Sequence, residues 1–174
     1  MDAPLFPLTE PATLVTDYAL AALCVGFACS LWKRSRAFGG RRVGPWVAAF
    51  LVTAFAALAG GTSHGFRIPL GESRRSVWNV TVASIAAGAL LLIAAGVRSA
   101  TRGEPKDEAS RREGILWLER AIVVSLLGLA VLVGKLSIHP HFNQNDLYHV
   151  IQMVGLYGLY RGALLLHGLS GSDS

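Results

Sequence analysis

Two ionisable residues, Asp146 and His149, stand three positions apart at the start of the last apolar segment of the chain. Residues with this spacing lie on the same face of a helix, so the two side chains can point to one place. The residues that follow, 153–166, are expected to be apolar enough to cross a membrane. Ionisable residues in a membrane helix are costly and usually mark a functional site. We therefore predict that Asp146 and His149 belong to such a site.

The helices that would position these residues belong to a membrane protein. The chain has 174 residues, of which 52% are hydrophobic and 16% are charged, and its mean hydropathy is +0.46. Soluble domains contain about 25% charged residues. The apolar runs approach the roughly 20 residues that a helix needs to cross a bilayer. We expect an all-α, polytopic integral membrane protein, located in a bacterial inner (plasma) membrane.

The apolar runs predict a single domain, residues 1–174, built as a compact bundle of five transmembrane helices. Small residues recur in the runs, and they allow helix backbones to approach closely. The expected helices cover residues 10–32, 46–64, 77–97, 115–138 and 146–166.

The basic residues predict how this bundle is oriented. Ten Lys and Arg residues follow the first and third expected helices, whereas three follow the second. Because basic loops favour the cytoplasm, the N-terminus is expected outside and the C-terminus inside. The net charge of +5 then reflects orientation and anionic lipid headgroups, so membrane lipids and no nucleic acid are the expected partners.

With this orientation, most polar residues near the helix ends fall on the outer side. Asp17 lies two turns inside the first helix, and Ser63 and His64 end the second. The remaining members of this outer set are Lys135, His139, His141, Asn143, Asn145, Asp146 and His149.

Imidazole nitrogens and carboxylate oxygens are zinc ligands, so we predict that His64, His149 and Asp146 bind a metal. Zinc lowers the pKa of bound water to about 7 and makes it a nucleophile. Asp17 would act as a general base or orient a ligand, and Ser63 could donate to a developing oxyanion. Two alternatives are a proton relay or a buried ion pair, for example between Asp17 and Lys135. A third is that Asp146 simply caps the last helix.

The segment Asn145-Asp-Leu-Tyr-His149, followed by Gly155-Leu-Tyr-Gly-Leu-Tyr-Arg161, resembles the last helix of the alkaline ceramidase family. That family belongs to a superfamily of membrane hydrolases that includes the progestin/adiponectin receptors. His149 matches the second His of the family's His-x-x-x-His motif, Tyr148 the aromatic residue before it, and His64 the His that ends the second helix. The resemblance implies zinc held by three His residues and hydrolysis of a lipid amide or ester.

The chain departs from the family pattern at three positions. Asn145 stands where the family has its first His, Gly60 where it has a Ser, and Arg75 where it has an Asp. The family has seven spans, and five are expected here.

Three functional hypotheses follow. The leading one is a membrane hydrolase of lipid amide or ester bonds with a metal site near the non-cytoplasmic face. The alternative is a small non-enzymatic subunit of a larger membrane complex, whose outer polar cluster binds a pigment, haem or lipid. A proton-coupled carrier is a weaker third, because the five spans show no internal repeat.

Overall fold

The computed structural model describes residues 8–39, 42–139 and 142–170, and the described part of the chain contains no β-strand. The prediction of an all-α fold is therefore confirmed. The helices are α1 (Pro11–Ala37), α2 (Gly44–Gly65), the short α3 (Arg67–Leu70), α4 (Ser73–Arg102), α5 (Glu108–Val133) and α6 (Gln144–Leu166).

Four of the long helices, α1, α2, α4 and α5, are long and apolar enough to cross a membrane. This agrees with an integral membrane protein. The fifth long helix, α6, has 23 residues but is not among these candidates. Its first turns carry polar residues from Gln144 to Gln152, which lower its hydropathy.

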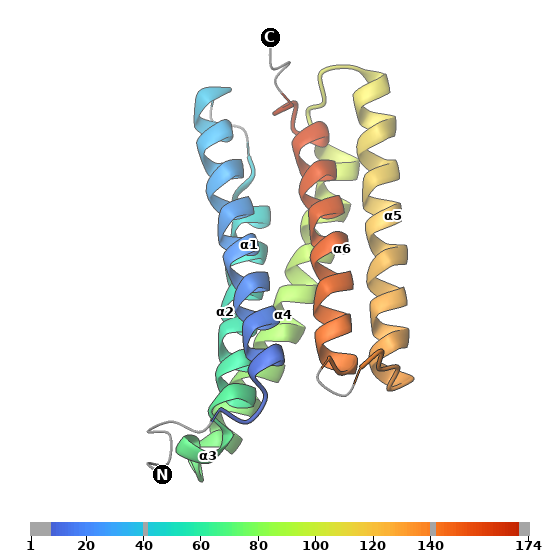
Figure 1. The fold of residues 1–174 in the computed structure, drawn as a ribbon. Helices are drawn as coiled ribbons and strands as arrows, with labels where there is room; N and C mark the ends of the chain where they lie inside the picture. Colours follow the sequence, from blue (N-terminus) through green and yellow to red (C-terminus); the bar gives the residue numbers. More distant parts are fainter. Residues whose placement is uncertain (1–7, 40–41, 140–141, 171–174) are drawn as a thin grey trace.

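The long helices form a bundle in which α2 packs against α1 and α4, while α6 packs against α5 and α1 (Figure 1). The buried core contains Leu31, Trp46, Phe50, Leu156 and Leu166. By contrast, α4 and α5 turn large hydrophobic side chains such as Leu90 and Val133 outward. Side chains of this kind suit a lipid environment.

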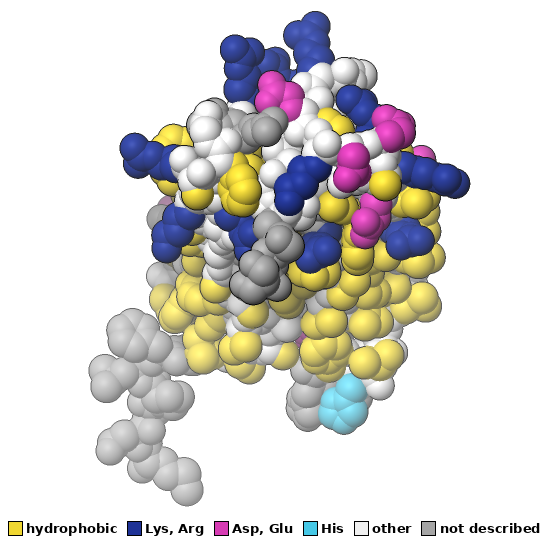
Figure 2. All heavy atoms as spheres, turned by 90° about the horizontal axis from the view of Figure 1, so that it is seen from above, with side chains coloured by type: hydrophobic (Ala, Val, Ile, Leu, Met, Phe, Trp, Pro, Cys, Tyr) yellow, Lys and Arg dark blue, Asp and Glu magenta, His cyan; other side chains and the backbone are white. Residues whose placement is uncertain are grey.

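The two ends of the bundle differ in charge. The α1–α2 and α4–α5 connections lie at one end together with the end of α6, whereas α3 and the α5–α6 connection lie at the other (Figure 1). Figure 2 looks onto the first end and shows Lys and Arg side chains gathered beside acidic ones. Here Asp107 caps α5 by accepting a hydrogen bond from the Ser110 backbone N–H at 2.6 Å. This hydrogen bond lowers the pKa of the Asp107 carboxyl below its ordinary value.

At the opposite end, α5 stops at Val133 and not at the expected Ile138. Lys135 has a positive φ of 51°, which is incompatible with a continued helix. The Ser137 hydroxyl then donates to the carbonyls of His139 and Phe142, at 3.1 and 3.3 Å, and closes a turn. Lys135 therefore follows the helix and does not sit in its last turn.

The start of α1 is fastened to the end of α2. Glu10 occupies the N-cap position of α1. The residue before it, Thr9, contacts the end of α2: its hydroxyl donates to the His64 carbonyl and its backbone N–H to the Gly65 carbonyl, at 3.1 Å for the latter. These hydrogen bonds hold the beginning of α1 beside the residues that end α2.

Candidate functional site

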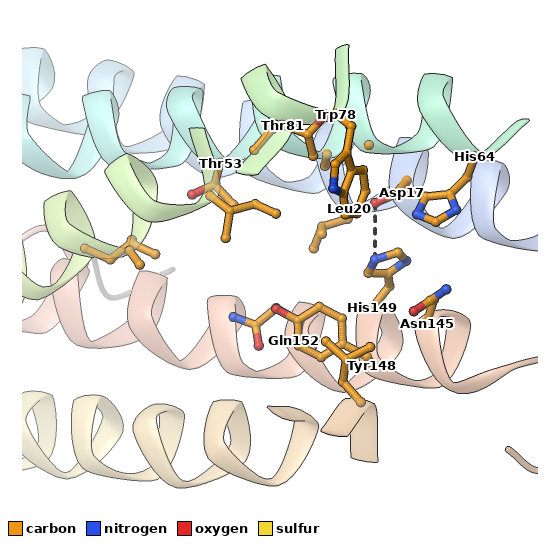
Figure 3. Close-up of a pocket in the computed structure, with 17 residues that line it drawn as sticks. Asp17, Leu20, Thr53, His64, Trp78, Thr81, Asn145, Tyr148, His149 and Gln152 are labelled. Atoms are coloured by element: carbon orange, nitrogen blue, oxygen red, sulfur yellow. Dashed lines mark ion pairs between the residues drawn. The ribbon is translucent and has the colours of Figure 1, made fainter. Parts of the chain in front are cut away.

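A pocket of about 220 Å³ lies toward the end of the bundle opposite the basic loops, among all five long helices (Figure 3). Most of its wall is apolar. Its lining residues are Asp17 and Leu20 of α1; Thr53, Ala56, Ala57, Gly60 and His64 of α2; Trp78, Thr81, Ile85, Ala89 and Leu92 of α4; Leu132 of α5; and Asn145, Tyr148, His149 and Gln152 of α6.

The central feature of the pocket is a contact between Asp17 and His149. The His149 Nε2 atom lies 3.3 Å from Asp17 Oδ1, and Figure 3 shows the two side chains facing each other from α1 and α6. Asp17 is 4% exposed and His149 is 9% exposed. The sequence left Lys135 open as a partner for Asp17, and the structure instead pairs Asp17 with His149.

Thr16 contacts the second ring nitrogen of His149. Its hydroxyl donates to the Thr13 carbonyl at 3.1 Å and lies 3.1 Å from His149 Nδ1. The two ring nitrogens of His149 therefore face two different groups of α1, with Nε2 toward the Asp17 carboxylate and Nδ1 toward the Thr16 hydroxyl. A carboxylate and an imidazole in contact are groups that can accept a proton and pass it on.

Two glycines of α2 make room for Asp17. A Cβ atom at position 61 would lie 2.8 Å from the Asp17 Cβ, so any larger residue there would push α1 away. A Cβ at position 60 would lie 3.5 Å from Asp17 Oδ2. Gly60 and Gly61 therefore allow α1 and α2 to cross closely at the depth of the pair.

A second histidine–carboxylate pair lies at the same pocket. His64 Nδ1 is 3.1 Å from Glu10 Oε2, and the His64 ring meets Trp78 edge-on, with 5.7 Å between ring centroids. The His64 and Glu10 side chains are 20% and 31% exposed. We did not single out Glu10 from the sequence. Its position at the start of a helix was visible, but its contact with a residue 54 positions away depends on tertiary packing.

Asp146 has a different role in the structure. It is fully buried, its Oδ1 accepts a hydrogen bond from the Thr13 hydroxyl at 2.8 Å, and its Oδ2 accepts one from the Asn143 backbone N–H at 2.8 Å. Asn143 and Asp146 together form a capping box at the start of α6. Asp146 therefore caps α6 and ties it to α1, and it does not line the pocket.

The structure thus brings Asp17, His64 and His149 together at the pocket. Asn145 also lines it. Ser63 is buried, at 2% exposed, and is not a lining residue. His139 is exposed on the α5–α6 turn, and His141 lies outside the described residues.

A family model described as a family of unknown function, DUF6962, matches residues 12–109 and 106–167. The chain belongs to this family. The matched regions contain Asp17, His64 and His149, so the whole pocket falls within the DUF6962 match. No curated protein and no solved structure matches the chain.

In this member of DUF6962, the side chains do not fit the metal site that the resemblance implies. Both ring nitrogens of His149 are engaged, by Asp17 and Thr16, and both carboxylate oxygens of Asp146 are engaged, by Thr13 and Asn143. Zinc needs three or more protein ligands. Within the described ranges, no group of three or more His, Cys, Asp and Glu could hold a metal ion. We therefore assign no metal ligand and derive no step through zinc.

Proposed function

We propose that the protein is an integral membrane hydrolase that cleaves an amide or ester bond of an amphipathic lipid. The observation that carries the proposal is the buried Asp17–His149 pair on the wall of a mostly apolar pocket. A carboxylate held by an imidazole can accept a proton as water attacks a carbonyl, which is general base catalysis. The apolar wall suits the hydrocarbon part of a lipid.

Each part of the pocket has a place in this reaction. Asp17, held by His149, takes the proton that the attacking water loses. The Asn145 amide and the Tyr148 hydroxyl line the same pocket and are hydrogen-bond donors that can stabilise the oxyanion formed on the carbonyl oxygen. These donors replace Ser63, which lies outside the lining. Water is activated by side chains alone.

We further propose that α6 crosses the membrane as a fifth span, which places the N-terminus outside and the C-terminus in the cytoplasm. Two features support this: α6 packs along α5 and α1, and the loops at the C-terminal end are basic. The pocket would then lie toward the non-cytoplasmic side of a bacterial plasma membrane, within reach of lipid.

A second candidate is a non-enzymatic subunit of a larger membrane complex. The apolar outer faces of α4 and α5 favour it, because only 17% of the residues in the most apolar stretch of each helix are buried inside the molecule. Another membrane protein could cover these faces as well as lipid could. In that case the pocket would hold a pigment, haem or lipid without cleaving it.

Hydrolysis by purified protein in lipid nanodiscs tests the proposal. Long-chain N-acyl and O-acyl lipids are supplied, and release of fatty acid is measured for the wild type, His149→Gln and Asp17→Asn. Each substitution is expected to lower kcat about 10²–10⁴-fold, the usual contribution of a general base. His139→Gln, which changes an exposed histidine outside the pocket, is the matched control and should retain activity.

Two results would count against the proposal. If the wild type cleaves none of these lipids, the subunit hypothesis takes its place. If activity is lost on chelation and restored by zinc, the reaction needs a metal, and the metal-free role of Asp17 and His149 is wrong.

A further inference from the structure

Two histidines line one pocket, each in contact with a carboxylate, and the environments of these two pairs differ. The inner pair, Asp17–His149, is almost completely buried. The outer pair, Glu10–His64, is partly exposed, with 20% of the His64 side chain and 31% of the Glu10 side chain accessible. Hydrolysis of an ester or amide requires two proton transfers, one from water and one to the leaving group. The second transfer therefore needs a proton donor other than the Asp17–His149 pair.

The geometry of the outer pair suits a proton donor. Glu10 Oε2 lies 3.1 Å from His64 Nδ1, so this nitrogen donates to the carboxylate and Nε2 is the ring nitrogen left for a ligand. The contact with Trp78 fixes the plane of the ring. Glu10 in turn is held in place by the hydrogen bonds from Thr9 to the end of α2. Figure 3 shows His64 and His149 entering the pocket from different helices, α2 and α6.

We propose that His64, oriented by Glu10, is the general acid that protonates the leaving group. The proposal rests on the hydrolase function proposed above. Water attacks the carbonyl carbon and loses one proton to Asp17 of the inner pair. The bond from carbon to the leaving oxygen or nitrogen then breaks, and that atom takes a proton from His64 Nε2. The products are a carboxylic acid and an alcohol or amine.

The difference in exposure explains why the two pairs have separate tasks. After one turnover the inner pair holds an extra proton and His64 lacks one. The inner pair passes its proton to the water that refills the pocket as the products leave. Because Glu10 and His64 are both accessible to solvent, His64 can recover its proton from water outside the pocket. A buried donor would recover its proton slowly. Glu10 is therefore a positioning residue, and His64 is the catalytic acid.

The test compares two substrates that carry the same acyl chain. One is an alkyl ester or amide, whose leaving group must be protonated, and the other is a 4-nitrophenyl ester, whose leaving group departs as a stable anion. His64→Gln should lower kcat about 10²–10⁴-fold on the first substrate, the usual contribution of a general acid, and less than about tenfold on the second. His149→Gln should lower kcat on both. Glu10→Gln, which keeps the imidazole, should show the His64 pattern more weakly.

Thermal melting of each variant reports whether it folds. If His64→Gln fails to fold, Glu10→Gln alone decides, because it leaves His64 in place. Equal losses on both substrates would overturn the assignment of His64 while leaving the hydrolase function intact. A wild type that cleaves neither substrate would instead contradict the hydrolase function itself.

Discussion

Asp146 and His149 are one turn apart on α6, yet they contact different parts of α1. His149 reaches Asp17 and Thr16 at the pocket, whereas Asp146 reaches Thr13 and its own helix start. Both Asp146 oxygens accept hydrogen bonds from the protein, and the side chain does not line the pocket. At the scale of single residues, hydrogen bonding and position thus separate Asp146, which caps α6, from Asp17, which lines the pocket and for which we propose a catalytic role.

Substitution of Asp146 should therefore affect stability more than chemistry. An Asn side chain has one acceptor oxygen, so Asp146→Asn cannot accept from both Thr13 and Asn143. Leaving a buried donor unpaired costs about 1–3 kcal/mol, and we expect a loss of that size in the free energy of unfolding. Thr13→Val is the matched variant, because it removes the hydrogen bond to Oδ1 from the other side. Both should melt at lower temperature in detergent.

Hydrolysis measured on the folded fraction of the same samples separates the two roles. We expect kcat to change less than about threefold in both variants, far below the losses that removal of a general base causes. An Asp146→Asn protein that melts like the wild type but loses most of its activity would assign Asp146 a functional role.

At the scale of elements, the crossing of α1 over α2 determines the site. Gly60 and Gly61 let Asp17 of α1 lie against α2, and the same crossing brings the start of α1 to His64. Small residues are a general means of close helix approach in membranes. Here they also decide where a buried carboxylate is placed.

Adding one methyl group at this crossing should disturb both packing and chemistry. Gly61→Ala would place a Cβ 2.8 Å from the Asp17 Cβ, so α1 must move outward. Overpacking of this kind costs about 1–3 kcal/mol, and a shifted Asp17 should also lower the rate of hydrolysis. Gly26→Ala on α1 is the control, because no atom lies within 4 Å of the added Cβ. The Gly26→Ala protein should match the wild type in melting temperature and in rate of hydrolysis. If the Gly61→Ala protein also matches the wild type, the crossing of α1 and α2 tolerates a wider spacing.

The sequence predicts the existence of the five long helices better than their ends. The apolar runs locate all five because hydropathy is a local property. The early end of α5 depends on the positive φ of Lys135 and on a turn closed by Ser137, which hydropathy does not register. Likewise, the sequence places Asp17, His64, Asp146 and His149 at one end of the bundle, and in the structure Asp17, His64 and His149 line one pocket whereas Asp146 does not. The contact between Glu10 and His64 could not be predicted, because it arises from the packing of α1 on α2.

At the scale of the whole molecule, the loops rich in Lys and Arg and the pocket lie at opposite ends of the bundle. The basic loops lie at the end of the bundle where α1, α4 and α6 stop (Figures 1 and 2). The Asp17–His149 and Glu10–His64 pairs lie toward the other end, where α1 and α6 begin and α2 stops. If the basic end faces the cytoplasm, an amphipathic substrate meets the pocket from the outer leaflet. The direction of the bundle in the membrane thus decides which pool of lipid the site can use.

Labelling of single cysteines in intact cells tests this direction and the fifth span together. Cys24 and Cys29 are first replaced by Ala, and one cysteine is introduced at Glu72, Ala37 or Ser170. An impermeant thiol reagent should label position 72, which precedes α4, and should not label position 37, which ends α1. Position 170 follows α6, so it stays unlabelled if α6 crosses the membrane and becomes labelled if α6 remains on the outer side.

In permeabilised cells the reagent should label all three positions, which excludes a buried thiol as the cause of protection. Labelling of position 37 but not of position 72 would show that the bundle has the opposite orientation. Both histidine–carboxylate pairs would then lie on the cytoplasmic side, and the substrate would have to come from the inner leaflet.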